Sequence, residues 1–217
     1  MLFYVTLALK NLRRHGKRTL ITASAIAIGL AAFLFIDSML QGADQQSQQN
    51  LIRYETGAMR VYTPQGAADR NRLSLKTPIE DPGPVLERLA SLGMEAAGRI
   101  SLAGEISVID ADSGDSLDQL ARVVAVDAEK DAAVFNRNAL SIEGRWMVRG
   151  SHEAVVGRWL AQDLRLKPGS ELTLNSRTRS GSYQVIDLIV SGIIDCPNPT
   201  INRGTVFVDL DTAAAER

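Results

Sequence analysis

Residues 19–36 read TLITASAIAIGLAAFLFI, a run of 18 residues without a charged side chain. At a rise of about 1.5 Å per residue, a helix of this length is close to the shortest that crosses a bilayer core of about 30 Å. Ser38, Met39 and Leu40 lengthen the run, and Asp37 stands near its far end. The sequence therefore predicts a membrane-spanning helix over residues 19–40.

Charge is distributed unevenly about this run. The first 36 residues contain no acid, and their five basic residues, which we expect to be positive-inside anchors, are Lys10, Arg13, Arg14, Lys17 and Arg18. The positive-inside rule then places a basic, amphipathic segment (residues 1–18) at the cytoplasmic face and the body outside the cytoplasm. The remaining residues carry a net charge of −6, so the chain does not have the basic surface of a nucleic-acid-binding protein.

Two other interpretations of the apolar run are weaker. A cleaved signal peptide has an apolar region of about 7–15 residues followed by a small-x-small site. Here the run is longer, and the nearby tripeptide at 41–43 begins with Gln41. A buried helix of a soluble protein is disfavoured by the flanking charges.

Small side chains lie on one face of the predicted helix, at Ala25, Gly29 and Ala32. Such a face lets two membrane helices approach closely, although alanine is also simply common in membrane helices. Residues 44–56 contain neither glycine nor proline. We therefore expect residues 41–56 to continue as a helical stalk, with a flexible linker as the alternative.

The body, residues 57–217, mixes short strand and helix patterns. Because these do not alternate strictly, the predicted class is α+β, with one N-terminal transmembrane helix followed by a mixed extracytoplasmic domain. Predicted strands are 59–63, 97–109, 121–126, 153–156, 171–175, 183–194 and 205–210; predicted helices are 84–92, 128–135, 158–164 and 211–217; and 64–84 is expected to be a loop.

Catalytic motifs are absent from the sequence. One cysteine, Cys196, and two histidines leave little for a thiolate or imidazole metal site. The chain has no phosphate-binding GxxxxGK[ST] loop, GxSxG elbow, HExxH or CxxC motif. We therefore expect no catalytic, cofactor-binding or metal-binding residues, and no enzyme activity in this chain.

Large apolar side chains in the body have two interpretations. Phe135, Trp146 and Met147 could contact a lipid or acyl chain, but core packing is the stronger alternative. Trp146 and Trp159 are both expected to be packing residues.

Several segments together carry a family resemblance. Residues 8–14 (ALKNLRR), 17–22 (KRTLIT) and 26–30 (IAIGL) resemble the N-terminal signature of the permeases of MacB/LolC/FtsX-type ABC transporters. The body is similar to the MacB-like periplasmic core domain at residues 142–146 (IEGRW), 154–157 (AVVG), 166–172 (LKPGSEL), 190–194 (VSGII) and 205–210 (TVFVDL). The order and spacing of these pieces are more specific than any one of them.

The resemblance implies a bacterial inner-membrane subunit that works with a cytoplasmic ABC ATPase and a second permease subunit, in a homo- or heterodimer. It implies no cofactor in this chain, contact with membrane lipid, and a lipoprotein or hydrophobic substrate. Such permeases pass ATP-driven motion to their periplasmic domain for lipoprotein release or efflux. They carry three further membrane helices, so the sequence is expected to be either a fragment or a degenerate subunit. The alternatives are a single-pass protein with an extracytoplasmic ligand-binding or sensor domain and, less favoured, a membrane-anchored enzyme.

Overall fold

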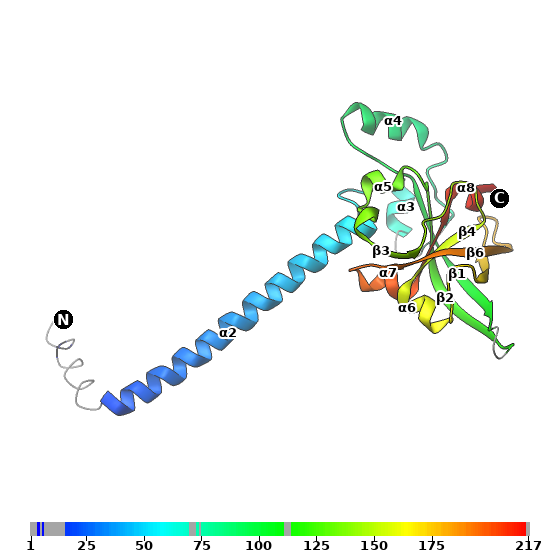
Figure 1. Ribbon diagram of the computed structural model, residues 1–217. Helices are drawn as coiled ribbons and strands as arrows, with labels where there is room; N and C mark the ends of the chain where they lie inside the picture. The colour runs from blue at the N-terminus through cyan, green and yellow to red at the C-terminus, as the bar shows by residue number, and fades with distance from the viewer. Residues whose placement is uncertain are drawn as a thin grey trace. The chain divides into compact units, whose positions relative to one another are not determined.

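The computed structural model describes residues 4, 6, 16–69, 73, 75–110 and 114–215 (Figure 1). Contacts divide the chain into two compact units, residues 1–49 and 50–217, which are described separately below. Most of the predicted interfacial segment, with Lys10, Arg13 and Arg14, lies outside the described residues.

The first unit is built on helix α2, Gly16–Leu51, which contains no buried residue. Within the described part of the chain, it gives the one helix that is long and apolar enough to cross a membrane. Ala25, Gly29 and Ala32 are exposed. Their role in packing against another membrane helix stays a prediction. Beyond the apolar run, amide groups of the helix bind carboxylates one turn earlier, from Gln41 to Asp37 at 2.7 Å and from Gln48 to Asp44 at 3.1 Å. Such pairs stabilise an exposed helix.

The second unit is a mixed α+β domain, which confirms the predicted class. Its helical elements are the π-helical turn Ile52–Thr56, α3 (Pro64–Asp69), α4 (Gly83–Ser91), α5 (Asp131–Val134), the 3₁₀ turn Arg137–Ala139, α6 (Arg158–Asp163), α7 (Pro199–Gly204) and α8 (Leu210–Ala215). Its strands are β1 (Arg99–Ile109), β2 (Ser116–Val126), β3 (Ser141–Gly144), β4 (Glu153–Gly157), β5 (Glu171–Arg177), β6 (Tyr183–Asp195) and β7 (Thr205–Asp209).

Six of the seven strands close into a ring. The strand order is β3-β6-β4-β7-β2-β1-β5, and β5 also pairs with β6. The long strand β6 makes this closure possible because its first half pairs with β5 and its second half with β4 and β3. Closure removes most of the free edges that an open sheet would expose.

The inside of this ring is the main apolar core. Alternate residues of all six strands point inward, as the period of two in a strand requires. The buried set from the strands comprises Leu102, Ile106, Val108, Ala121, Val123, Ala125, Ala154, Val156, Leu172, Leu174, Ile186, Leu188, Val190, Ile193, Val206 and Val208. Helix α6 and the turn after it add Leu160, Ala161, Leu164 and Leu166 to the same core.

A second buried group, the outer cluster, covers the other face of part of the ring. It consists of Tyr54, Val124, Val126, Ala128, Met147, Val155, Ile194, Cys196, Ile201 and Phe207. Its members come from the turn after α2, from four strands, from α7 and from loops. Segments far apart in the sequence therefore meet here.

Two predictions for the segment after the stalk are wrong. Residues 59–63 alternate as a strand does, but they pair with no strand among the described residues, and Met59 is 64% exposed. Residues 64–84 are not wholly a loop, since α3 begins at Pro64. The Thr63 hydroxyl accepts a hydrogen bond from the Gly66 N–H at 3.0 Å, which caps this helix.

Other differences have local causes. The predicted helix 128–135 shortens to α5 because the Asp127 carboxylate accepts from the backbone N–H groups of Glu129 and Lys130, which forms a turn instead. Strand β3 and helix α7 were not predicted, although α7 carries a visible start signal: the Asn198 side chain caps it by accepting from the Thr200 N–H at 3.1 Å. Trp159, expected to be a packing residue, is 38% exposed, and the guanidinium carbon of Arg203 lies 5.7 Å from the centroid of its ring.

The tightest glycine gives a test of this fold. A Cβ at Gly157, the last residue of β4, would collide with the carbonyl oxygen of Ile201 and lie 2.8 Å from that of Asn202. Because backbone atoms cannot move aside cheaply, we expect Gly157→Ala to destabilise the protein by about 2 kcal/mol. For a chain of this size, the melting temperature should fall by about 4–8 °C.

Gly98→Ala is the matched control, because nothing lies within 4 Å of its added Cβ. Thermal melts of the full chain in detergent should separate the two variants. Equal melting temperatures would contradict the close packing of α7 against the end of β4.

Candidate functional site

The candidate site lies where the chain leaves helix α2 and enters the second unit. Here the helix ends in one π-helical turn, Ile52–Thr56, which we call the docking turn. The Gly57 N–H donates to the Ile52 carbonyl at 3.0 Å, and Gly57 has φ = 68°. This backbone conformation favours glycine, so Gly57 ends the helix and turns the chain away.

Tyr54 fixes the docking turn by apolar contact. Its side chain is 9% exposed and belongs to the outer cluster with Val126, Ile201 and Phe207. A buried aromatic side chain of this kind contributes several kcal/mol to packing. The docking turn is therefore held as part of the domain.

Glu55 fixes the docking turn by charge. One carboxylate oxygen lies 2.6 Å from Arg122 Nη1 on β2, and the other accepts from Asn198 Nδ2, before α7, at 3.0 Å. The side chains of Glu55 and Arg122 are 17% and 25% exposed. Because both carboxylate oxygens are used, Glu55 joins two separate parts of the domain to the docking turn.

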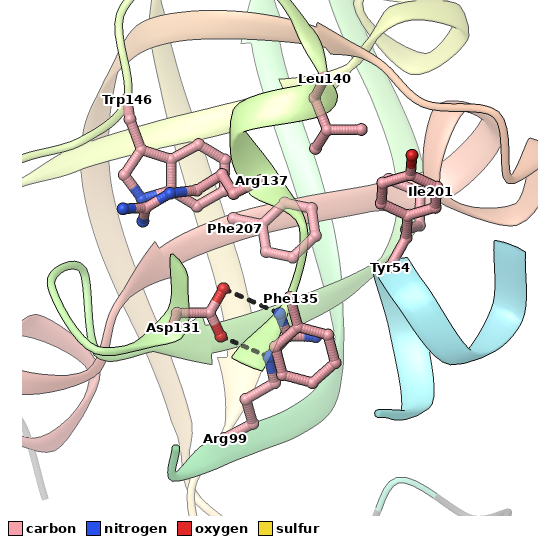
Figure 2. Close-up of a pocket in the computed structure, with 9 residues that line it drawn as sticks. All are labelled: Tyr54, Arg99, Asp131, Phe135, Arg137, Leu140, Trp146, Ile201 and Phe207. Atoms are coloured by element: carbon pink, nitrogen blue, oxygen red, sulfur yellow. Dashed lines mark hydrogen bonds and ion pairs between the residues drawn. The ribbon is translucent and has the colours of Figure 1, made fainter. Parts of the chain in front are cut away.

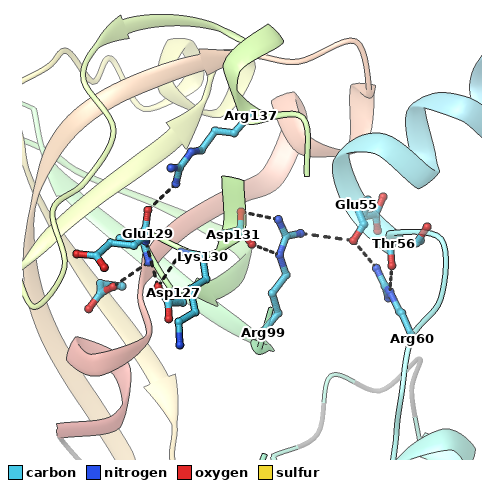
Figure 3. A network of polar contacts seen from close by, with 11 residues as sticks. Glu55, Thr56, Arg60, Arg99, Asp127, Glu129, Lys130, Asp131 and Arg137 are labelled. Atoms are coloured by element: carbon cyan, nitrogen blue, oxygen red, sulfur yellow. Dashed lines mark hydrogen bonds and ion pairs between the residues drawn. The ribbon is translucent and has the colours of Figure 1, made fainter. Parts of the chain in front are cut away.

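Backbone groups of the docking turn extend this network (Figure 3). The Arg53 carbonyl accepts from the Asn136 N–H at 3.2 Å, and the Glu55 carbonyl accepts from Arg60 Nη2 at 2.6 Å. Arg99 Nη1 reaches the same Glu55 carbonyl at 3.5 Å. The docking turn is thus tied to β1 and to the segment after α5 as well.

Arg99 forms the second ion pair of the site. It holds the Asp131 carboxylate through two hydrogen bonds, 2.6 Å from Nε and 2.8 Å from Nη2, and its guanidinium lies over the Phe135 ring at 3.2 Å from the centroid. Asp131 is buried, with its side chain 2% exposed. A two-bond pair of this geometry is directional, so it sets the position of α5 relative to β1.

A narrow hollow opens between these groups (Figure 2). It is lined by Tyr54, Arg99, Asp131, Phe135, Arg137, Leu140, Trp146, Ile201 and Phe207. Of the residues predicted to contact substrate, Phe135 and Trp146 line the hollow, and Met147 is buried in the outer cluster beside it. All three take part in packing here, and contact with substrate stays a prediction.

Burial shifts the pKa of two groups beside the hollow. Burial lowers the pKa of Arg137, and the charge of Arg99 adds to this while Asp131 opposes it. Burial also raises the pKa of the Cys196 thiol, with the carboxylates of Asp195 and Glu55 adding to the effect and the N–H of Asn198 opposing it. A raised thiol pKa means that little reactive thiolate is present near neutral pH.

The contacts around the docking turn are suited to holding structural elements together rather than to catalysis. Among the described residues, no three histidine, cysteine, aspartate or glutamate side chains converge as metal ligands would. What converges on the docking turn is a set of ion pairs, hydrogen bonds and aromatic contacts. They join the docking turn to three parts of one domain.

The class of protein follows from the long apolar helix together with the family of the domain that comes after it. The model of the MacB-like periplasmic core domain matches residues 19–217, so the chain belongs to this family, and the predicted resemblance is confirmed. The family is that of ABC-transporter-type permeases, which are generally non-catalytic and have a separate ATPase partner. No curated protein matches the chain.

Cys196 can report on the docking turn. It lies in the outer cluster with Tyr54 and is 4% exposed. In the native chain at pH 7, we expect thiol-reactive maleimide to label Cys196 only slowly. Tyr54→Ala should raise the labelling rate about tenfold or more, since losing a buried aromatic side chain costs several kcal/mol and ~1.4 kcal/mol changes an opening equilibrium tenfold.

Leu92→Ala is the control, because Leu92 is an apolar side chain that is 56% exposed and follows α4. Its labelling rate should equal that of the wild type. If Tyr54→Ala also left the rate unchanged, Tyr54 would not hold the cluster closed over Cys196.

Proposed function

We propose that the chain is a permease subunit of a mechanotransmitting ABC transporter of the MacB/LolCDE type. Helix α2 spans the bacterial inner membrane with its N-terminus in the cytoplasm, and the second unit lies in the periplasm. The protein works with a cytoplasmic ATPase and a second permease subunit, on a lipoprotein or another hydrophobic substrate. Its family supports this assignment, as does the apolar, membrane-length helix found among the described residues.

The observation that carries the proposal is the anchoring of the docking turn. A helix can pass displacement to a domain only if its end is firmly joined to that domain. Tyr54 supplies a buried apolar contact, and Glu55 supplies a 2.6 Å ion pair to Arg122 and a 3.0 Å hydrogen bond to Asn198. Movement of the helix end then acts directly on β2 and on the loop before α7.

The displacement would then pass from the docking turn into the sheet. Arg122 stands on β2, which pairs with β1 on one side and with β7 on the other. Closed rings of packed strands deform little, because interiors are dense and nearly incompressible. The domain therefore moves as one body when the docking turn moves.

Glu55→Gln tests the contact between the docking turn and β2, which we call the joint. The substitution removes the charge that pairs with Arg122 but keeps the size of the side chain. In proteoliposomes with the partner ATPase, we expect assembly and ATP hydrolysis to persist. Substrate release per ATP should fall about five- to tenfold, within the usual range of coupling free energies.

Glu80→Gln is the matched control, since it breaks an ion pair with Arg179 in which both side chains are well exposed. Exposed pairs contribute little, so release should stay at the wild-type level. Normal release by Glu55→Gln would refute a role for the joint, and loss of ATP hydrolysis would point to a defect elsewhere.

Insertion of two glycines after Gln46 tests the helix itself. Each glycine costs about 1 kcal/mol in a helix interior, so the exposed stalk should lose rigidity while the docking turn stays intact. We expect the complex to assemble and hydrolyse ATP but to export little. Unchanged export would show that no rigid helix is needed between the membrane and the docking turn.

A further inference from the structure

Part of the outer surface of the closed sheet lies outside the outer cluster. It is formed by the outward side chains of residues 103–109 on β1, 171–177 on β5 and 183–189 on β6, and we call it the open face. Its large apolar side chains, all at least 50% exposed, are Ile109, Tyr183, Val185 and Ile189. Exposed apolar side chains that gather on one face mark an interaction site.

The strand register makes the open face symmetric about one row of residues. In this row, Ile106 pairs with Leu174 and Leu174 pairs with Ile186, and all three side chains point into the core. The outward residues of each strand lie at equal distances on either side of the row. A two-fold axis that crosses the strands here would place each of them opposite one known residue of a second copy.

Charge is matched in this arrangement. Arg177 and Glu171 lie three positions on either side of Leu174 on β5, so Arg177 of each copy meets Glu171 of the other. Neither side chain forms an ion pair within the described part of the chain. The remaining acids of the open face, Glu105 and Asp187, meet uncharged residues. No two like charges therefore come directly opposite each other.

Apolar side chains are matched on the two outer strands of the face. Tyr183 and Ile189 lie three positions on either side of Ile186, so they meet across the contact on β6. Ala103 and Ile109 meet in the same way on β1. Both ends of the contact would thus bury apolar surface, which is the main favourable term in protein association.

The size of the open face limits the strength of such a contact. With about 3.3 Å per residue and about 4.8 Å between strands, the face spans roughly 20 by 10 Å between its outer Cα atoms. A stable interface buries about 800 Å² on each partner. The contact therefore needs two copies that are already held close together, as two membrane-anchored chains are.

We propose that the open face pairs with the open face of a second copy of this chain, about a two-fold axis that crosses β1, β5 and β6. Apolar side chains fill the contact, and two pairs of Arg177 with Glu171 fix its register. The inference rests on the proposed function, in which two anchored subunits lie side by side, and it names a copy of this chain as the second subunit.

Cross-linking of the full chain in liposomes tests the contact. Cys196→Ala removes the native thiol, and Val185→Cys places a new one beside the axis. There the two Cα atoms would be about 12 Å apart, from a sheet spacing of about 10 Å and two positions along the strand. We expect a flexible bismaleimide to yield a cross-linked dimer. Val148→Cys is the matched control, because Val148 is about as exposed and lies in the loop between β3 and β4, so it should yield only the dimer of chance encounters.

An exchange of charges tests the register. Arg177→Glu or Glu171→Arg, each added to Val185→Cys, would bring like charges together and should lower the dimer yield about fivefold or more. The two variants mixed should regain the parent's yield, since each supplies the charge that the other needs. Arg177 and Glu171 are about 20 Å apart on one strand, so this recovery cannot arise within one copy.

Three results would overturn the proposal: no excess of dimer at Val185 over Val148, unchanged yields in the charge variants, or no recovery when folded variants are mixed. Both charged side chains are exposed, so each variant should melt at the parent's temperature, which checks that it is folded. The assay uses neither ATP nor substrate. A negative result would refute this contact, while the transport role stays with the release assay of Glu55→Gln.

Discussion

The ion pair between Glu55 and Arg122 is the contact on which the candidate site depends. It places a carboxylate from the turn after the membrane-type helix against a strand of the closed sheet, at 2.6 Å and with both side chains mostly buried. Removing one partner of such a pair would leave the other charge poorly solvated. The pair therefore fixes one position for the docking turn, and Tyr54 adds a buried apolar contact in the outer cluster.

The docking turn is bound to a closed sheet. Strand β6 is long enough to pair with β5 at one end and with β4 at the other, so the ring has a single packed interior. The outer cluster then covers part of the ring with side chains from the docking turn, from the loop before α7 and from the segment around Trp146. The docking turn therefore contacts one packed body rather than separate loops.

The hollow beside the joint has a different character. Its Arg99 binds both oxygens of Asp131, whereas Arg137 forms no ion pair among the described residues and the Trp146 Nε1–H is buried without a partner there. Both groups lie beside the docking turn, where the side chains that line the hollow come from segments far apart in the sequence.

Much of this protein is determined by sequence alone. Eighteen uncharged residues after five bases predict a membrane-type helix, and the alternation of apolar side chains placed β1, β4, β5, β6 and β7 close to where they lie, whereas β2 begins at Ser116, before the predicted strand 121–126. Periodicity and charge are local properties that a sequence displays directly. The alternation at residues 59–63 predicted a strand wrongly because a strand also needs a neighbour, which no local pattern reveals. The site depends on such distant neighbours throughout: Glu55 meets Arg122 and Asn198 across 67 and 143 positions of sequence. Only the folding of the sheet into a ring, which brings β2 and the loop before α7 to the same face, decided that these residues form one joint.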